Sequence, residues 1–471
     1  MFHDLAEFYE WFAERNQENE YEVTRTSLDM MDGWHIHDQT GDVAHRSGKF
    51  FSIRGLEVCT DHRDTNSWTQ PIILQPEIGI LGIVMTVANG TVYCLMQAKM
   101  EPGNINLLQL SPTVQATRSN YTRVHQGNPV PYLDHFMAPR GGRAVFDALQ
   151  SEQGSWFLNK RNRNMIVEVA EELPPLDDFC WLSLEQLATL MRVPNLVNMD
   201  ARTVLSGIPF FFTETSLDRA GPLSTDLGPG GDPLHSVEQL LSWFTEVKSR
   251  YYLTRRELPL SGLPHWVRSS GEIVHEEKRY FSVIGVNVQA SSREVSQWSQ
   301  PMLAPVDRGV IGFLGRQIAG VFHILVQART EAGTHDVVEM SPTVNCIPAN
   351  YAGLPAERHP WYLEAFSRAS SSSTIVDVVH SEEGGRFFHA ENQYLVVDVG
   401  QDFDLDVPDD FCWMTVSQLT GFIRYGNHVN VAARCLLSCL AGEPDRAVGT
   451  RGRRDIGRSS DVPELSALPE G

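Results

Sequence analysis

The spacing of apolar residues predicts that two amphipathic helices open the two halves of the chain. Apolar side chains recur every three or four residues, as on one face of a helix, at Leu5, Phe8 and Phe12 and again at Val237, Leu240, Leu241 and Phe244. Ser236 precedes the second run and Gln239 follows three residues later, which is the pattern of a capping box. We therefore expect both helices to begin close to these positions.

Short β-rich runs follow the first helix, and further helices follow the runs. Residues 49–58, 78–87 and 91–98 are rich in β-branched and aromatic side chains and are separated by Gly, Asn and Pro. Box-like pairs at Ser183 and Gln186, and at Thr415 and Gln418, predict two closing helices, with shorter helical stretches after Asn198 and Asn430. The order helix, mixed sheet, helices occurs twice, so the fold class expected is α+β.

An internal duplication explains this recurrence. Residues 94–121 and 324–351 align without a gap and share Ser-Pro-Thr-Val and a final Asn-Tyr. The same offset of 230 residues places Trp68 on Trp298, and after a two-residue insertion Asp177-Asp178-Phe179-Cys180-Trp181 falls on the same five residues beginning at Asp409. A period of this length is too long for a solenoid, so two homologous tandem domains are predicted.

The predicted organisation has four parts. The first repeat spans 1–212 and the second 235–440. The stretch 213–234 contains GPLSTDLGPGGDP and is expected to be a flexible linker. Residues 441–471 contain few large apolar side chains and are expected to form a disordered tail.

Charge and composition exclude some partners. The 471 residues include 38 Lys and Arg against 59 Asp and Glu, a net charge of −21, which disfavours nucleic acid. A few local cations can still hold a small diphosphate. Neither a signal peptide nor an 18-residue apolar run is evident, so a membrane partner is not expected. Seven cysteines without zinc spacing suggest reduced thiols in a cytoplasm.

The densest set of polar side chains follows a predicted strand at 93–99. Gln97 and Lys99 share one face of that strand, and a turn at Pro102-Gly103-Asn104 leads into a second strand at 107–110. Ser111, Thr113 and Gln115 then alternate, and Arg118 and Arg123 follow. Ser-Pro-Thr-Val is also a common way to start a strand. Polar residues nevertheless persist here in both copies, which favours a pocket for a sugar and a diphosphate.

Other candidate sites carry weaker signals. Trp68 and Trp298 can stack on a base, although large aromatic side chains more often fill a core. His35, His37, His45 and His62 lack a fixed ligand spacing, so no metal is expected. The glycine-rich phosphate loops, the GxSxG nucleophile elbow and the glutamate-rich signature of Nudix hydrolases are not found. These absences disfavour a kinase, a Rossmann dehydrogenase, an α/β hydrolase and a diphosphate hydrolase.

Three phrases of the sequence resemble the NDP-hexose 2,3-dehydratase family. They are QPIILQPEIGILGIV, QAKMEPGNINLLQLSPTVQATRSNYTRVH and SEEGGRFFHAENQYLVVDV, and the resemblance extends over roughly residues 5–440. It implies two Nudix-like domains in tandem, a homodimer, the substrate dTDP-4-keto-6-deoxyglucose and no redox cofactor. It also implies loss of water to a dTDP-3,4-diketo-2,6-dideoxyhexose in 2-deoxysugar and antibiotic biosynthesis, with the product passed to a 3-ketoreductase.

Such an elimination needs groups that transfer protons, and we expect the first repeat to supply them. A base takes the carbon-3 proton and an acid assists the departing hydroxyl, and Lys99 and Glu101 are the nearest proton-transfer groups to the polar wall. The substrate-binding residues expected are Trp68, Gln97, Asn104, Asn106, Gln109, Ser111, Thr113, Gln115, Arg118, Asn120, Tyr121 and Arg123.

The second repeat is expected to hold a vestigial or binding-only pocket. Lys99 is matched there by Arg329, which does not release its proton. The residues expected in this second pocket are Trp298, Gln327, Arg329, Glu331, Asp336, Glu339, Ser341, Thr343, Asn350 and Tyr351. A non-catalytic protein that binds dTDP-sugars is the alternative from another functional class.

Overall fold

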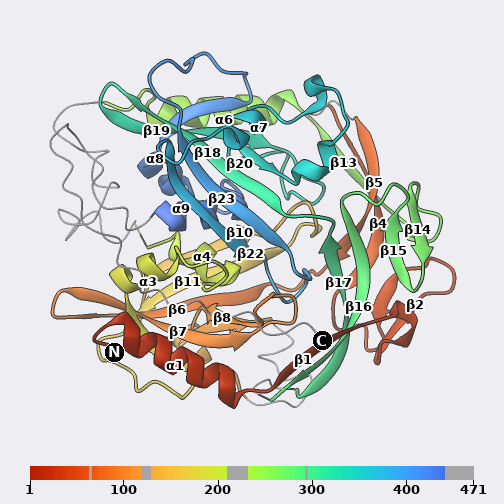
Figure 1. Ribbon diagram of the computed structural model, residues 1–471, viewed down its shortest axis with the longest axis horizontal. Coiled ribbons are helices and arrows are strands. Elements are labelled where there is room, and N and C mark those ends of the chain that lie inside the picture. Colours follow the sequence, from red (N-terminus) through yellow and green to blue (C-terminus); the bar gives the residue numbers. More distant parts are fainter. Residues whose placement is uncertain (63–65, 118–128, 209–231, 292–294, 441–471) are drawn as a thin grey trace.

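The computed structural model describes residues 1–62, 66–117, 129–208, 232–291 and 295–440. Two seven-stranded sheets face each other with α4 and α9 between them, and two five-stranded sheets lie at one side (Figure 1). The linker and tail predicted at 213–234 and 441–471 lie mostly or wholly outside the described residues. Among the described residues, no helix is long and apolar enough to cross a membrane.

The seven-stranded sheet of the first repeat contains the expected polar segment. Its path is β10-β11-β6-β7-β12, with β8 paired to β7 and β9 paired to β6. A tight turn at Asn89 and Gly90, both with positive φ, joins β6 to β7. The bounds are β6 Gly79–Ala88, β7 Thr91–Met100, β8 Leu108–Ser111, β9 Val114–Ala116, β10 Arg143–Ser151, β11 Arg161–Glu168 and β12 Phe179–Ser183.

The second repeat builds the same sheet from equivalent segments. Its path is β22-β23-β18-β19-β24, with β20 on β19 and β21 on β18. The parallel pair β11 and β6 has its counterpart in β23 and β18. The bounds are β18 Gly309–Ile318, β19 Val321–Arg329, β20 Glu339–Ser341, β21 Val344–Cys346, β22 Thr374–Ser381, β23 Glu391–Asp398 and β24 Phe411–Thr415.

The two smaller sheets exchange one strand between the repeats. Strand β1 (Tyr21–Thr26) pairs with β16 (Phe281–Ala290) of the second repeat, and β13 (Leu253–Leu258) pairs with β4 (Ser52–Thr60) of the first. The exchanged strands join sheets otherwise built within one repeat. The remaining strands are β2 Trp34–Ile36, β3 Val43–His45, β5 Ser67–Leu74, β14 Trp266–Ser269, β15 Glu272–His275 and β17 Gln297–Pro305.

The helices begin where the capping patterns predict. Capping boxes are present at Ser183, Ser236 and Thr415, and Asn198 caps α4 through its side chain. The bounds are α1 Leu5–Glu18, α3 Leu184–Leu190, α4 Met199–Leu205, α6 Val237–Arg250, α7 Leu363–Ser367, α8 Val416–Phe422 and α9 Val431–Leu440, with 3-10 turns η1 Leu28–Met30, η2 Leu133–His135, η5 Pro348–Tyr351 and η6 Ala356–Arg358.

One apolar core continues from the first repeat into the second. Phe8 and Ile83 belong to the same buried cluster as Phe313 and Leu436. Two buried arginines cross the boundary in symmetric fashion, since Arg202 donates to the carbonyl oxygen of Ser381 and Arg434 to that of Ser151. The two homologous repeats therefore share both sheets and core.

We expect neither repeat to fold alone. A fragment of residues 1–212 lacks β13 and leaves β1 without β16, and it exposes the half of the core that packs on the other repeat. Expressed separately, it should show no cooperative thermal transition by circular dichroism, whereas co-expression with residues 213–471 should restore one. A cooperative transition of the isolated fragment would contradict this expectation.

Candidate functional site

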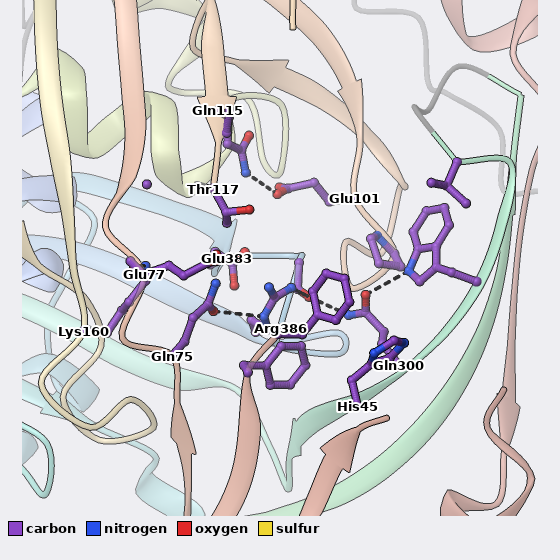
Figure 2. A pocket seen from close by; sticks show the side chains of 18 of the residues that line it. His45, Gln75, Glu77, Glu101, Gln115, Thr117, Lys160, Gln300, Glu383 and Arg386 are labelled. Atoms are coloured by element: carbon purple, nitrogen blue, oxygen red, sulfur yellow. Dashed lines mark hydrogen bonds between the residues drawn. The ribbon is translucent and has the colours of Figure 1, made fainter. Parts of the chain in front are cut away.

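A pocket of about 450 Å³ lies where the polar wall of the first repeat meets loops of the second. Lys99 lies near the end of β7, Glu101 follows that strand, and Gln115 belongs to β9, so the three residues form one wall. Figure 2 shows the contact between Glu101 and Gln115. The connection between β22 and β23 brings Glu383 and Arg386 of the second repeat into the same lining. Further lining residues are Trp34, Gln75, Glu77, Glu152, Lys160, Asp200, Trp298 and Gln300.

Glu101 is held in place by amide groups. Its Oε1 accepts a hydrogen bond of 2.6 Å from Gln115, and its Oε2 accepts bonds of 3.3 Å from Asn104 and Asn198. Ser111 in turn donates to the side-chain oxygen of Gln115 at 3.0 Å. The alternating polar residues of the sequence thus orient a carboxylate that is only 3% exposed.

Burial perturbs several charged groups around the pocket. The ammonium of Lys160 contacts the carbonyl oxygen of Glu77, and burial lowers its pKa to about 8 although Glu152 opposes that shift. Burial raises the pKa of Asp200 well above its ordinary value, and the negative charges of Glu101 and Glu152 act in the same direction. Burial likewise raises the pKa of Glu383 to about 8. Groups with pKa values near neutrality are suited to proton transfer.

The other end of the pocket is aromatic. Trp298 donates to Gln300 at 2.9 Å, and the indole of Trp34 donates to the carbonyl oxygen of Ser299 at 2.7 Å. The guanidinium carbon of Arg386 lies 4.2 Å from the centre of the Phe51 ring. Arg386 therefore lies between the aromatic end and the carboxylates (Figure 2). The aromatic end suits a nucleotide base, Arg386 suits a diphosphate, and the carboxylates beyond it suit a sugar.

Several predicted binding residues have structural partners instead of lining this pocket. Thr113 bridges two strands, because its hydroxyl donates to the carbonyl oxygen of Leu95 and accepts from the amide of Val84. Gln109 bonds Asn106 and Ser381, which ties the first repeat to the second. Asn106 itself donates to the carbonyl oxygen of Asn195, and Gln97 is half-buried in β7. Arg118, Asn120, Tyr121 and Arg123 lie outside the described residues.

The two tryptophans lie at other places than the repeat-by-repeat expectation gives them. The sequence places Trp298 in the second pocket, yet this residue lines the first, and Trp68 packs with Leu56 and Val58 away from it. The physical reason is that the pocket forms across the boundary between the repeats, so each wall faces residues of the other copy. An assignment repeat by repeat does not anticipate this arrangement.

The residues expected in the second pocket form a different network. Glu331 accepts from Ser155 at 3.0 Å and lies 3.4 Å from Arg329. Asp336 forms an ion pair of 2.7 Å with Lys248, and Glu339 accepts from Ser151 at 2.9 Å, with its pKa raised to about 7 by burial. Thr343 repeats the strand bridge of Thr113, Ser341 is buried in β20, and Gln327 lies in β19. Asn350 accepts from the amide of Tyr280, and Tyr351 contacts His359.

Four charged residues that line the first pocket, two from each repeat, have uncharged counterparts in the other repeat. Lys160 and Asp200 correspond to Ala390 and Ala432, and Glu383 and Arg386 correspond to Gln153 and Trp156. None of these four charged residues is among the site residues predicted from the sequence. The signal that could have found them is the departure from the duplication at 153, 156, 390 and 432, since only one copy keeps charge at each.

Comparisons with known proteins agree on one family. The model of the NDP-hexose 2,3-dehydratase family matches residues 5–208 and again 237–440. A dTDP-4-dehydro-6-deoxy-alpha-D-glucopyranose 2,3-dehydratase of Streptomyces violaceoruber is 54% identical over 94% of this chain and 98% of its own length. Enzymes of the same name from Saccharopolyspora spinosa and Amycolatopsis orientalis are 46% and 47% identical, over 92% and 91% of this chain and 91% and 88% of their own. The chain belongs to the NDP-hexose 2,3-dehydratase family, as the resemblance implied, and these relatives are named as 2,3-dehydratases.

Proposed function

We propose that this protein removes water from carbons 2 and 3 of dTDP-4-keto-6-deoxyglucose and yields a dTDP-3,4-diketo-2,6-dideoxyhexose. The observation that carries the proposal is one pocket in which Lys99, Glu101 and Glu383 lie beside Arg386 and an aromatic end. The three relatives named for a 2,3-dehydratase support the same reaction.

The chemistry requires groups that move protons. The 4-ketone makes the hydrogen on carbon 3 acidic, so a base can remove it and leave an enolate stabilised by hydrogen-bond donors. The hydroxyl on carbon 2 then departs with a proton supplied by an acid. The resulting enol rearranges to the diketone. Because no hydride is transferred, the reaction needs no nicotinamide.

We assign catalysis to the first pocket, with Lys99 and Glu101 in its proton-transfer machinery. Lys99 donates to the carbonyl oxygen of Gln115 at 2.9 Å, which keeps its ammonium at the wall beside Glu101. An ammonium there is placed to protonate the departing hydroxyl. Arg386 is the candidate partner of the diphosphate, and Trp298 and Trp34 are candidate contacts of the thymine base.

Other features of the proposal follow from family resemblance. We propose Nudix-like repeats, a homodimer, a cytoplasmic location, and a 3-ketoreductase that consumes the product. The same sheet plan in both repeats is compatible with Nudix-like domains. The seven free cysteines are compatible with a cytoplasmic location.

We expect turnover that is independent of added metal or NAD. Purified protein is incubated with dTDP-4-keto-6-deoxyglucose, a 3-ketoreductase and NADPH, and NADPH oxidation is followed with and without a chelator. Equal rates in both arms are expected, because proton transfer by side chains accounts for each step. Loss of turnover with chelator and its return with a metal would contradict the mechanism.

The same assay separates the enzyme from a binding protein. The enzyme consumes NADPH in proportion to its own concentration. A dTDP-sugar binding protein would give a saturable isotherm by calorimetry with no NADPH consumed above the ketoreductase blank. Magnesium-dependent release of dTMP would indicate a diphosphate hydrolase.

A further inference from the structure

The connection between β22 and β23, residues 382–390, is fixed against the first repeat by backbone hydrogen bonds. The amide of Gly103 donates to the carbonyl oxygen of Gly384 at 2.7 Å. The amide of His389 donates to the carbonyl oxygen of Gly103, also at 2.7 Å. Arg202 of α4 donates to the carbonyl oxygen of Ser381 at 2.5 Å. A segment of the second repeat is thereby held as a wall of the pocket in the first.

Glu383 is the carboxylate that this segment brings into the pocket. Figure 2 shows it in the middle of the lining, on the side of the pocket away from Gln300 and His45. Its Oε2 is buried and has no hydrogen-bond partner within the described parts of the chain. Both oxygens of Glu101, in contrast, accept bonds from amides. Glu383 thus has an oxygen not already engaged as an acceptor, whereas both Glu101 oxygens are engaged.

The surroundings of Glu383 strengthen it as a base. Burial raises its pKa to about 8, Arg386 opposes this shift, and the nearby negative charges add to it. The charged groups that face it are Arg386 on the same connection, Glu101 after β7, Glu152 and Lys160 beside β10 and β11, and Asp200 in α4. A carboxylate with a raised proton affinity abstracts a weakly acidic C–H proton faster than an ordinary one.

The duplication supports the same residue independently. The position of Glu383 is occupied by Gln153 in the first repeat, and this amide donates to Glu382 at 2.7 Å. An amide cannot accept a proton at neutral pH. Within the described residues, the pocket built on Lys99 therefore combines an ammonium with a carboxylate from the opposite repeat, whereas the equivalent position at 153 is an amide.

We propose that Glu383 is the base that accepts the carbon-3 proton, and this assignment rests on the proposed function. The C–H electron pair forms the enolate as the proton moves to the carboxylate. The C2–O bond then breaks, its electron pair leaves with the hydroxyl, and Lys99 supplies the proton that completes water. Glu383 returns its proton to carbon 2 of the enol while the enol proton passes to the Lys99 amine, which restores both groups.

The test compares two isosteric substitutions in the full-length protein. Glu383→Gln is expected to lower kcat by about a hundred- to ten-thousandfold, the usual effect of removing a proton-transfer group. Glu391→Gln makes the same change at a carboxylate in β23 that bonds Asn195 and Arg308 and does not line the pocket. It should remain within about twofold, since no proton transfer is lost. Circular dichroism and dTDP affinity should be unchanged in both.

Two readouts distinguish a base from a structural group. In the wild type kcat/KM should rise with pH through about 8, because the carboxylate is the active form and is present above that pKa. This limb should be absent in Glu383→Gln. Substrate deuterated at carbon 3 should slow Glu383→Gln by a larger factor than it slows the wild type. Should Glu383→Gln fail to fold, Glu383→Asp is measured, and it should keep the pH limb with a lower kcat.

The outcomes separate this inference from the proposed function. If the wild type fails to turn over the substrate, the proposed function itself fails. If the wild type turns over and Glu383→Gln keeps kcat within tenfold with the pH limb intact, the function stands and Glu383 is not the base.

Discussion

Lys99→Met is expected to lower kcat at least a hundredfold while the protein stays folded. The substitution removes an ammonium that lies at the pocket wall and donates to the carbonyl oxygen of Gln115. Removal of a proton-transfer group costs on the order of a hundred- to ten-thousandfold in rate. Glu101→Gln, which removes the adjacent negative charge, is expected to cause a loss in the same range. The rates are measured with the coupled ketoreductase assay, and folding is checked by circular dichroism.

The matched controls are the equivalent positions of the second repeat. Arg329→Met and Glu331→Gln should stay within about tenfold, because their pocket lacks the counterparts of Lys160, Asp200, Glu383 and Arg386 and no proton transfer is lost there. If these two variants are more damaging than the changes at 99 and 101, catalysis occurs in the second repeat. Asp336 or Glu339 then becomes the better candidate base.

Gly103→Ala should reduce both stability and activity. A Cβ at this position would lie 1.9 Å from the carbonyl oxygen of Phe387 and 2.7 Å from that of Gly384, both of which are backbone atoms. Overpacking costs about 1–3 kcal/mol, and the upper part of this range is expected because neither oxygen can rotate away. The displaced segment carries Glu383 and Arg386, so kcat should fall together with Tm.

Gly421→Ala is the control for this prediction. Gly421 lies in α8, and a Cβ added there would meet no atom within 4 Å apart from its chain neighbours and the backbone of its own helix. Alanine should therefore not lower stability, and any gain should stay below the roughly 0.5–1 kcal/mol of a helix interior, because Gly421 lies in the last turn of α8. Thermal unfolding and the coupled assay are measured on both variants. A Gly103→Ala protein with unchanged Tm and kcat would contradict the close approach of the two repeats.

The sequence predicts the local elements well because their signals are local. The capping boxes at Ser183, Ser236 and Thr415 depend on residues three positions apart, and each helix begins at its predicted box. The duplication likewise predicts two sheets of the same plan. The exchange of β1 and β13 is not predicted, since the choice between pairing within a repeat and across repeats depends on contacts far apart in sequence.

The site could be predicted only in part for the same reason. Lys99, Glu101 and Gln115 line the pocket together because they follow one another along β7, its turn and β9. Thr113 belongs to the same polar run, yet its hydroxyl is used to bridge two strands. Glu383 and Arg386 come from the opposite repeat, and their departure from the duplication is the sequence signal that marks them as site residues.

The most direct test of the central claim is a crystal structure of Glu383→Gln with dTDP-4-keto-6-deoxyglucose bound. The proposed mechanism predicts the sugar ring between Lys99 and the side chain at position 383, with carbon 3 facing that side chain. The diphosphate should contact Arg386, and the thymine ring should lie at the end of the pocket formed by Trp34 and Trp298. Sugar density found only beside Arg329 and Trp156 would contradict this mechanism.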